Sequence, residues 1–300
     1  MYLPKGIIPA LATPFNNDKT INYKAYYEYL DYLIEEGVHG LLIGGTTAEY
    51  TLLNDKDRKE LIKNSVDYIN NRVPIVVGTS CHKTEDTITL TQYAATVGAS
   101  AALILPPYYL QTTRKGIVDY YKEISNNTNI SIMIYHFPNI TGVTLDTNLI
   151  YELSQIENVV SLKNTTNFVS TSKAIDATKD NPEFTVLTGM QDLVLPTIAV
   201  GGDGAMCVIP GLIPKEILNI YNFITQENDI KKASMLNKEL ISLYTLVDSQ
   251  PFPGNVKSGL EVLGRCKNIV QHPLEPGGDE AKNKIGKELK KLGYNVNLEI

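Results

Sequence analysis

The feature that most constrains the fold is a regular alternation of short apolar runs with longer amphipathic segments. Short apolar runs are typical of strands buried on both faces of a parallel sheet, and apolar residues at helical spacing predict the helices between them. We expect eight such strand–helix units. Their strands are placed at residues 6–15, 40–45, 74–79, 101–105, 131–135, 159–163, 184–187 and 204–209.

These units predict one closed α/β barrel. Each unit occupies roughly 25–30 residues, and no linker rich in Pro, Gly or Ser separates them. We therefore expect a (β/α)8 TIM barrel over residues 1–225 and a C-terminal helical extension packed on it over residues 226–300. An open doubly wound sheet is the alternative, but no Gly-x-Gly-x-x-Gly motif follows the first strand.

Composition narrows the expected partners. The net charge of −6 argues against a nucleic-acid-binding surface, so a small molecule is the expected partner. No apolar run approaches the roughly 20 residues of a membrane span, and residues 1–5 lack signal-peptide character, which predicts a cytoplasmic protein with no membrane partner.

Cys81, Cys207 and Cys266 lack the paired spacing of a disulfide framework or metal site, and each is expected to be a small buried or half-buried side chain.

The strand at residues 159–163 ends in a lysine. Side chains alternate along a strand, so Ser161, Lys163 and Thr165 share one face. Burial would lower the pKa of a lysine and make it a nucleophile for carbonyl groups. The alternative is that Lys163 opens the following loop and points to solvent.

Ligands of such barrels bind at the carboxyl ends of the strands, and two further ends are polar. The strand at 40–45 runs into Gly44-Gly45-Thr46-Thr47-Ala48-Glu49, a possible carboxylate cradle or an ordinary turn and helix cap. On the strand at 131–135, Tyr135 can face the barrel mouth beside Lys163 and relay protons, or it can be an aromatic core plug.

The remaining motifs favour structural roles. His136 follows Tyr135 and should face the helix layer, and the four histidines show no metal-ligand spacing. No Gly-x-Ser-x-Gly motif indicates serine chemistry. Residues 201–204 are interpreted as the turn entering the eighth strand, because they precede a strand instead of following one into a helix.

Four segments in order resemble the dihydrodipicolinate synthase and N-acetylneuraminate lyase family. They are Gly44-Gly45-Thr46-Thr47-Ala48-Glu49, Pro107-Tyr108-Tyr109, Tyr135-His136-Phe137-Pro138-Asn139-Ile140-Thr141-Gly142 and Leu162-Lys163. The resemblance covers residue 6 to about residue 265. It implies a (β/α)8 class I aldolase in which a lysine forms a Schiff base with pyruvate or another 2-oxo acid, with no metal and no cofactor.

The resemblance assigns roles residue by residue. Lys163 is the imine lysine, Tyr135 the proton-relaying phenol, and Thr46 and Thr47 hold the 2-oxo acid carboxylate, Thr46 also being a catalytic candidate. Tyr109 is similar to a catalytic tyrosine that reaches a neighbouring subunit's site, which implies a homotetramer built as a dimer of dimers. The remaining substrate-binding candidates are Gly189, Asp192 and Met206.

The chain departs from the family pattern at positions that bear on the substrate. Ile140 stands where the dihydrodipicolinate synthases carry an arginine for the aldehyde's carboxylate, so a bidentate partner is missing. Ala48 replaces a glycine beside the cradle and is expected to narrow the mouth. Met190-Gln191-Asp192 replaces the acidic pair of the sialic acid lyases. The Tyr-x-Phe-Pro-x-x-Thr-Gly spelling and the segments at residues 184–189 and 201–205 resemble the 2-keto-3-deoxy sugar acid aldolases most.

The expected function is a Schiff-base lyase that cleaves a 2-oxo-3-deoxy or 4-hydroxy-2-oxo acid to pyruvate and an aldehyde. Two alternatives within the family are dihydrodipicolinate synthase and N-acetylneuraminate lyase activity. An alternative of another class is a catalytically silent 2-oxo acid binding protein.

Overall fold

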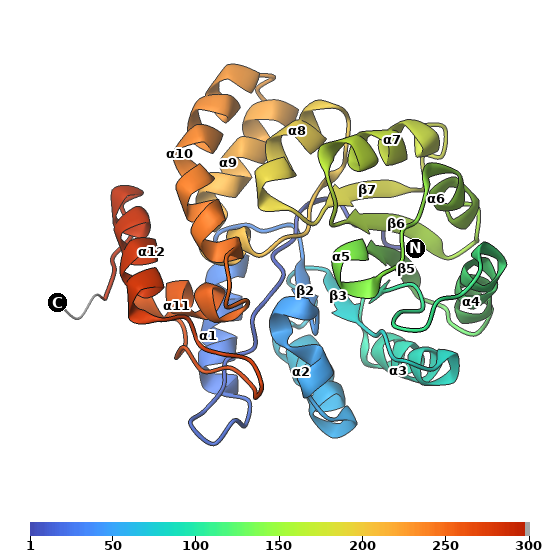
Figure 1. Ribbon diagram of the computed structural model, residues 1–300, viewed down its shortest axis with the longest axis horizontal. Coiled ribbons are helices and arrows are strands. Elements are labelled where there is room, and N and C mark those ends of the chain that lie inside the picture. The colour runs from blue at the N-terminus through green and yellow to red at the C-terminus, as the bar shows by residue number, and fades with distance from the viewer. Residues whose placement is uncertain (298–300) are drawn as a thin grey trace.

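The computed structural model describes residues 1–297 and shows a barrel of parallel strands surrounded by helices (Figure 1). Its hydrogen-bonded strand order is β1-β8-β7-β6-β5-β4-β3-β2. The strands described are β1 (Gly6–Ile7), β2 (Leu41–Ile43), β3 (Ile75–Gly78), β4 (Ala101–Ile104), β5 (Ser131–His136), β6 (Val159–Asn164), β7 (Thr185–Thr188) and β8 (Gly204–Ala205). Beyond β1, Ala10 forms a parallel bridge with Leu42, and this bridge joins β1 to β2 and closes the barrel.

Helices follow the strands in sequence and cover the barrel from outside (Figure 1). They are α1 (Tyr23–Glu35), α2 (Asp55–Ile69), α3 (Thr84–Val97), α4 (Arg114–Asn126), α5 (Pro138–Thr141), α6 (Thr147–Leu153), α7 (Phe168–Thr178), α8 (Val194–Ala199) and α9 (Pro214–Thr225). Several begin at side chains that accept a backbone N–H three residues later, as Asn54 does for α2 and Asn167 for α7. These caps fix where the helices start.

Short 3₁₀ turns occupy three strand-to-helix connections. They are η1 (Thr46–Ala48) and η2 (Tyr50–Leu52) after β2, η3 (Gln191–Leu193) after β7, and η4 (Ile209–Gly211) after β8. All lie on the side of the barrel where the strands end, which is where ligands bind in folds of this type.

The alternation expected for β5 is confirmed. Ile132 and Ile134 pack with buried residues of α4 and α6, whereas Met133 and Tyr135 belong to a different apolar cluster, which also holds Leu103 of β4 and Leu187 of β7. The odd-numbered side chains of β5 are therefore turned away from the helices and toward the barrel interior.

The (β/α)8 fold class is confirmed, but two predicted strands are too long. The first was expected over 6–15 and ends at Ile7, because Pro9 and Pro14 have no N–H for a ladder. The last was expected over 204–209 and ends at Ala205. Ala10 N still donates to Cys207 O (2.8 Å). The residues after β8 therefore remain hydrogen-bonded to those after β1, although neither segment continues as a regular strand.

The C-terminal helices α10 (Ile230–Asp248), α11 (Gly254–Val262) and α12 (Asp279–Lys291) lie together beside α9 and α1 (Figure 1). The hydroxyl of Tyr294 donates to Glu216 Oε2 of α9 (2.6 Å), and this hydrogen bond links the segment after α12 to the barrel. Residues 298–300 of the predicted extension lie outside the described residues. Within residues 1–297, no helix has both the length and the apolar character that crossing a membrane requires.

Candidate active site

Lys163 lies inside the barrel near the carboxyl end of β6. Its side chain is 4% exposed, which contradicts the alternative that it points to solvent. Burial lowers its pKa from 10.5 to about 8, because the charged form loses its hydration. At neutral pH about a tenth of such a group is an uncharged amine, which is the nucleophilic form.

Tyr135 stands beside Lys163 on β5. The two residues are register partners, and Lys163 Nζ lies 4.3 Å from the centre of the Tyr135 ring. The Tyr135 hydroxyl is 3.2 Å from Thr46 Oγ1, a hydrogen bond in which either group can donate. Burial raises the pKa of Tyr135 to about 12, so it stays a phenol that can give and take a proton.

The turn η1 brings Thr46 and Thr47 to the barrel mouth from β2. Gly44 has φ +67°, a conformation that favours glycine. Its carbonyl oxygen lies close to Gly78 of β3, where an added Cβ would be only 2.1 Å from it. Thr47 is 3% exposed, and Thr46 is bonded to Tyr135. The expected carboxylate cradle therefore adjoins the lysine–tyrosine pair.

Gly189 lies against Lys163 just after β7. A Cβ at this position would be 2.0 Å from Thr165 Oγ1 and 3.0 Å from Lys163 Cε, so only a glycine leaves room for both side chains. Thr165 is 6% exposed and shares the face of Lys163, as alternation predicts. Its closeness to Gly189 was not predicted from the sequence.

A pocket of about 580 Å³ opens outward from Thr165, and we call it the distal pocket. Thr165 lines this pocket and, like Lys163, lies against Gly189, so one wall of the pocket is close to the lysine although Lys163 itself does not line it. Most residues of its lining are polar, and none is a lysine or an arginine: Asn139, Thr144, Thr166, Asn167, Ser170 and Asp192 contribute amide, hydroxyl and carboxylate groups.

Ile140 and Met206, which the sequence also singled out, have distinct positions. Ile140 is 50% exposed on α5, next to Asn139 of the distal pocket, and offers no charge. Met206 is fully buried in the core after β8 and is not among the residues that line the distal pocket. The neighbouring Cys207 is also buried; burial raises the pKa of its thiol to about 12, and it interacts electrostatically with Lys163.

His136 has the structural position expected for it. Its Nε2 accepts the backbone N–H of Leu145 (3.0 Å), and its Nδ1 bonds Asn164 Oδ1 (2.9 Å). Burial lowers its pKa, so the ring stays neutral and links the ends of β5 and β6.

The turn interpretation of residues 201–204 also holds, since Gly201 has φ +94° and Gly202 N donates back to Thr197 O (2.8 Å).

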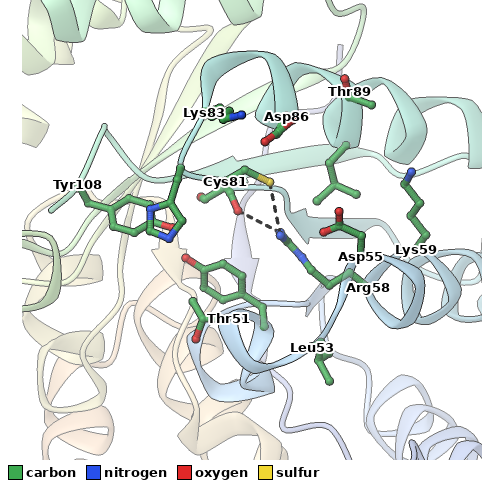
Figure 2. Close-up of a pocket in the computed structure, with 14 residues that line it drawn as sticks. Thr51, Leu53, Asp55, Arg58, Lys59, Cys81, Lys83, Asp86, Thr89 and Tyr108 are labelled. Atoms are coloured by element: carbon green, nitrogen blue, oxygen red, sulfur yellow. Dashed lines mark hydrogen bonds between the residues drawn. The ribbon is translucent and has the colours of Figure 1, made fainter. Parts of the chain in front are cut away.

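Tyr108 and Tyr109, which follow β4, diverge. Tyr109 is 87% exposed with φ +73° and projects from this single chain. Tyr108 lines a second pocket of about 450 Å³, which we call the outer pocket, and its ring lies 4.8 Å from that of His82 (Figure 2).

The outer pocket is organised by Arg58 of α2. Its guanidinium donates to Ser80 O (3.0 Å) and to Cys81 Sγ (3.4 Å), and lies over the ring of Tyr50 (Figure 2). The pocket's lining does not include Lys163, Tyr135 or Thr46, but Tyr50 in this lining interacts electrostatically with Tyr135. Among residues 1–297, no cluster of three His, Cys, Asp or Glu side chains is placed to hold a metal ion.

The chain matches the model of the dihydrodipicolinate synthetase family over residues 3–292. It is 33% identical over 293 residues to a 4-hydroxy-tetrahydrodipicolinate synthase of Methanocaldococcus jannaschii, covering 96% of this chain and 99% of that protein. It is 31% identical to the probable 2-dehydro-3-deoxy-D-pentonate aldolase YjhH of Escherichia coli K12, covering 93% and 94%. Among solved structures, the prophage protein YagE of Escherichia coli K12 in complex with pyruvate superposes with a TM-score of 0.93 at 27% identity, covering 98% of this chain and 100% of that one.

A barrel of this form, with these relatives, defines an enzyme of the aldolase and lyase class. More specifically, the chain belongs to the dihydrodipicolinate synthetase family, as its motifs led us to expect.

Proposed function

We propose that this protein is a class I aldolase that cleaves a 2-oxo-3-deoxy or 4-hydroxy-2-oxo acid to pyruvate and an aldehyde, with condensation as the reverse reaction. The observation that carries this proposal is the burial of Lys163 inside the barrel, which lowers its pKa to about 8. Beside it lie Tyr135 and Thr46, whose hydroxyl groups are hydrogen-bonded to each other. A neutral amine next to a proton relay is what imine formation requires.

The proposed reaction starts when neutral Lys163 attacks the C2 carbonyl of the substrate. Tyr135 delivers a proton to the carbonyl oxygen, and loss of water from the carbinolamine leaves an iminium ion. When the C3–C4 bond breaks, its electron pair moves into the iminium to give an enamine, and the C4 hydroxyl passes its proton to the Tyr135 phenolate as the aldehyde forms. Protonation of the enamine at C3 and hydrolysis of the imine release pyruvate and restore the lysine.

Thr46 and Thr47 are the proposed binding site of the 2-oxo acid carboxylate. Hydroxyl and backbone N–H donors of a tight turn suit an anion. The bond between Thr46 and Tyr135 also gives the phenol a partner to which a proton can pass. No metal and no organic cofactor takes part in this scheme.

The distal pocket supports an uncharged, hydroxylated aldehyde half. Its amide and hydroxyl groups and Asp192 can bind hydroxyls, whereas a carboxylate would find no cation in its lining. The pentonate aldolase named among the relatives fits this chemistry. Dihydrodipicolinate synthase activity is the second candidate because relatives with that name match almost the whole chain, but Ile140 leaves the aldehyde's carboxylate without a bidentate partner.

A substrate panel tests the proposal. We expect turnover of 2-oxo-3-deoxy pentonates or hexonates to pyruvate, and poor condensation of pyruvate with aspartate semialdehyde. Efficient condensation with aspartate semialdehyde and no cleavage of sugar acids would favour the synthase. Pyruvate binding without turnover of any member would favour the silent binder.

We also propose a cytoplasmic homotetramer arranged as a dimer of dimers. The exposed Tyr109 supports this assembly, because a large aromatic side chain held out on a strained backbone is suited to insertion into a second subunit.

A further inference from the structure

We propose that Glu49 and Lys257 are positioning residues, through which the C-terminal helical layer holds the carboxylate cradle Thr46–Ala48 in place for substrate. This inference rests on the proposed function, since it concerns the cradle's affinity for a 2-oxo acid. Neither residue has a place in the reaction scheme above, and both are buried ionisable groups.

The two side chains form a fully buried ion pair across the junction of barrel and extension. Lys257 Nζ on α11 lies 2.5 Å from Glu49 Oε1, and both side chains are 0% exposed. Lys257 also donates to Ile269 O (2.6 Å) and lies 4.1 Å from the centre of the Phe15 ring. Burying two charges is costly, so such a pair is retained where it fixes an arrangement that apolar contacts would not specify.

The other carboxylate oxygen of Glu49 accepts a hydrogen bond from the loop after α11. Gln271 N donates to Glu49 Oε2 (2.6 Å), and the Gln271 amide donates to Lys19 O (2.8 Å). Lys19 Nζ in turn donates to Val270 O (2.6 Å). Glu49 is thus the centre of a network that joins the turn after β2, the segment before α1 and the C-terminal layer.

Glu49 directly follows the cradle, and its backbone needs outside support. It has φ +59°, a left-handed conformation that is uncommon for a residue with a side chain. This residue lets the chain reverse between η1 and η2, and its N–H donates to Thr46 O (3.0 Å). Because the backbone of Glu49 closes the cradle turn, anchoring its side chain restricts where Thr46 and Thr47 can sit.

The double variant Glu49→Gln with Lys257→Met tests this role without leaving one buried charge unpaired. Hydrogen exchange in the ligand-free protein should quicken in a peptide spanning 44–52, while peptides from β5 and β6 stay protected. The matched control is Tyr294→Phe, which removes a contact between the C-terminal layer and α9 but does not touch the cradle. It should leave exchange in 44–52 unchanged.

A second readout uses the proposed chemistry. Trapping of the Lys163 imine with borohydride should need about tenfold or more pyruvate for half-maximal labelling in the double variant, while the rate at saturating pyruvate changes less than about threefold, since Lys163 and Tyr135 are untouched. A change only in global stability, equal to that of the control, is what a merely structural pair predicts.

The outcomes separate the two proposals. Unchanged exchange in 44–52 together with unchanged half-saturation overturns the positioning role. If the wild-type protein is not labelled at all, the Schiff-base function fails, and the exchange experiment still decides whether the pair orders the turn. If the double variant does not fold, Glu49→Gln alone carries both tests, because glutamine keeps the oxygen that accepts from Gln271 but loses the ion pair, and Lys257, whose pKa is already lowered by burial, can become neutral by losing its proton.

Discussion

Lys163 owes its lowered pKa to burial more than to any charged neighbour. Desolvation is the main cause of its lowered pKa, and the interaction with Cys207 acts weakly in the opposite direction. In the proposed mechanism the apolar barrel interior lowers the pKa of the nucleophile, and the polar groups around it position the substrate.

The desolvation of Lys163 predicts how the rate of imine formation depends on pH. The rate of imine formation at subsaturating pyruvate should rise about tenfold per pH unit below pH 8 and level off above it, because the neutral fraction of Lys163 saturates there. Between about pH 8 and 10.5 the unfolded chain binds more protons than the folded one, so the cost of burying Lys163 falls as pH rises through this window. A rate still climbing at pH 10 would mean that the lysine is hydrated.

Tyr135→Phe isolates the proton relay. The substitution keeps the ring that packs beside Lys163 and removes the hydroxyl bonded to Thr46. Imine formation should slow by about 10²-fold or more, the usual scale for losing a general acid or base, while pyruvate affinity changes less. An unaltered rate would make Tyr135 a packing residue, and Tyr120→Phe, whose ring belongs to the outer helix layer, is the matched control.

At this scale the sequence predicts which side chains face the barrel interior where strand alternation applies. The inward positions of Tyr135 and Lys163 follow from the period of two. The closeness of Cys207 to Lys163 does not, because it depends on the barrel closing through irregular backbone after β8.

At the scale of elements, the strands are predictable and their connections are not. Most predicted strands lie within a residue or two of those observed, and the misses at β1 and β8 arise from prolines and from irregular pairing. The distal pocket is formed by α5, the start of α7 and η3, whose arrangement depends on packing between loops that no short sequence pattern encodes.

The element α5 carries a prediction on specificity. Ile140→Arg would place a cation beside the distal pocket, where the position is half exposed and can accept a longer side chain. Use of aspartate semialdehyde should improve more than use of uncharged aldehydes, measured as the ratio of kcat/KM values. Ile140→Gln controls for size without charge, and an equal gain from it would show that charge is not the cause.

At the scale of the whole molecule, one barrel and one helical layer form the chain, and we propose that a second copy completes the site through Tyr109. The expected assembly in solution is a tetramer by sedimentation velocity or light scattering. Tyr109→Ala should lower imine formation while Lys163 remains buried, because the missing group belongs to the neighbouring subunit's site. Full activity of a stable monomer would contradict the role of Tyr109.

The most direct test of the account is chemical trapping at Lys163. Incubation with pyruvate and borohydride should add one pyruvate-derived mass to the peptide that contains Lys163, and Lys163→Arg should abolish it, because a guanidinium stays charged and cannot be the amine nucleophile. Lys5 and Lys173 near the surface, and Lys257 in its buried ion pair, should stay unlabelled. Labelling at another lysine, or none with pyruvate and any other 2-oxo acid, would contradict the Schiff-base mechanism.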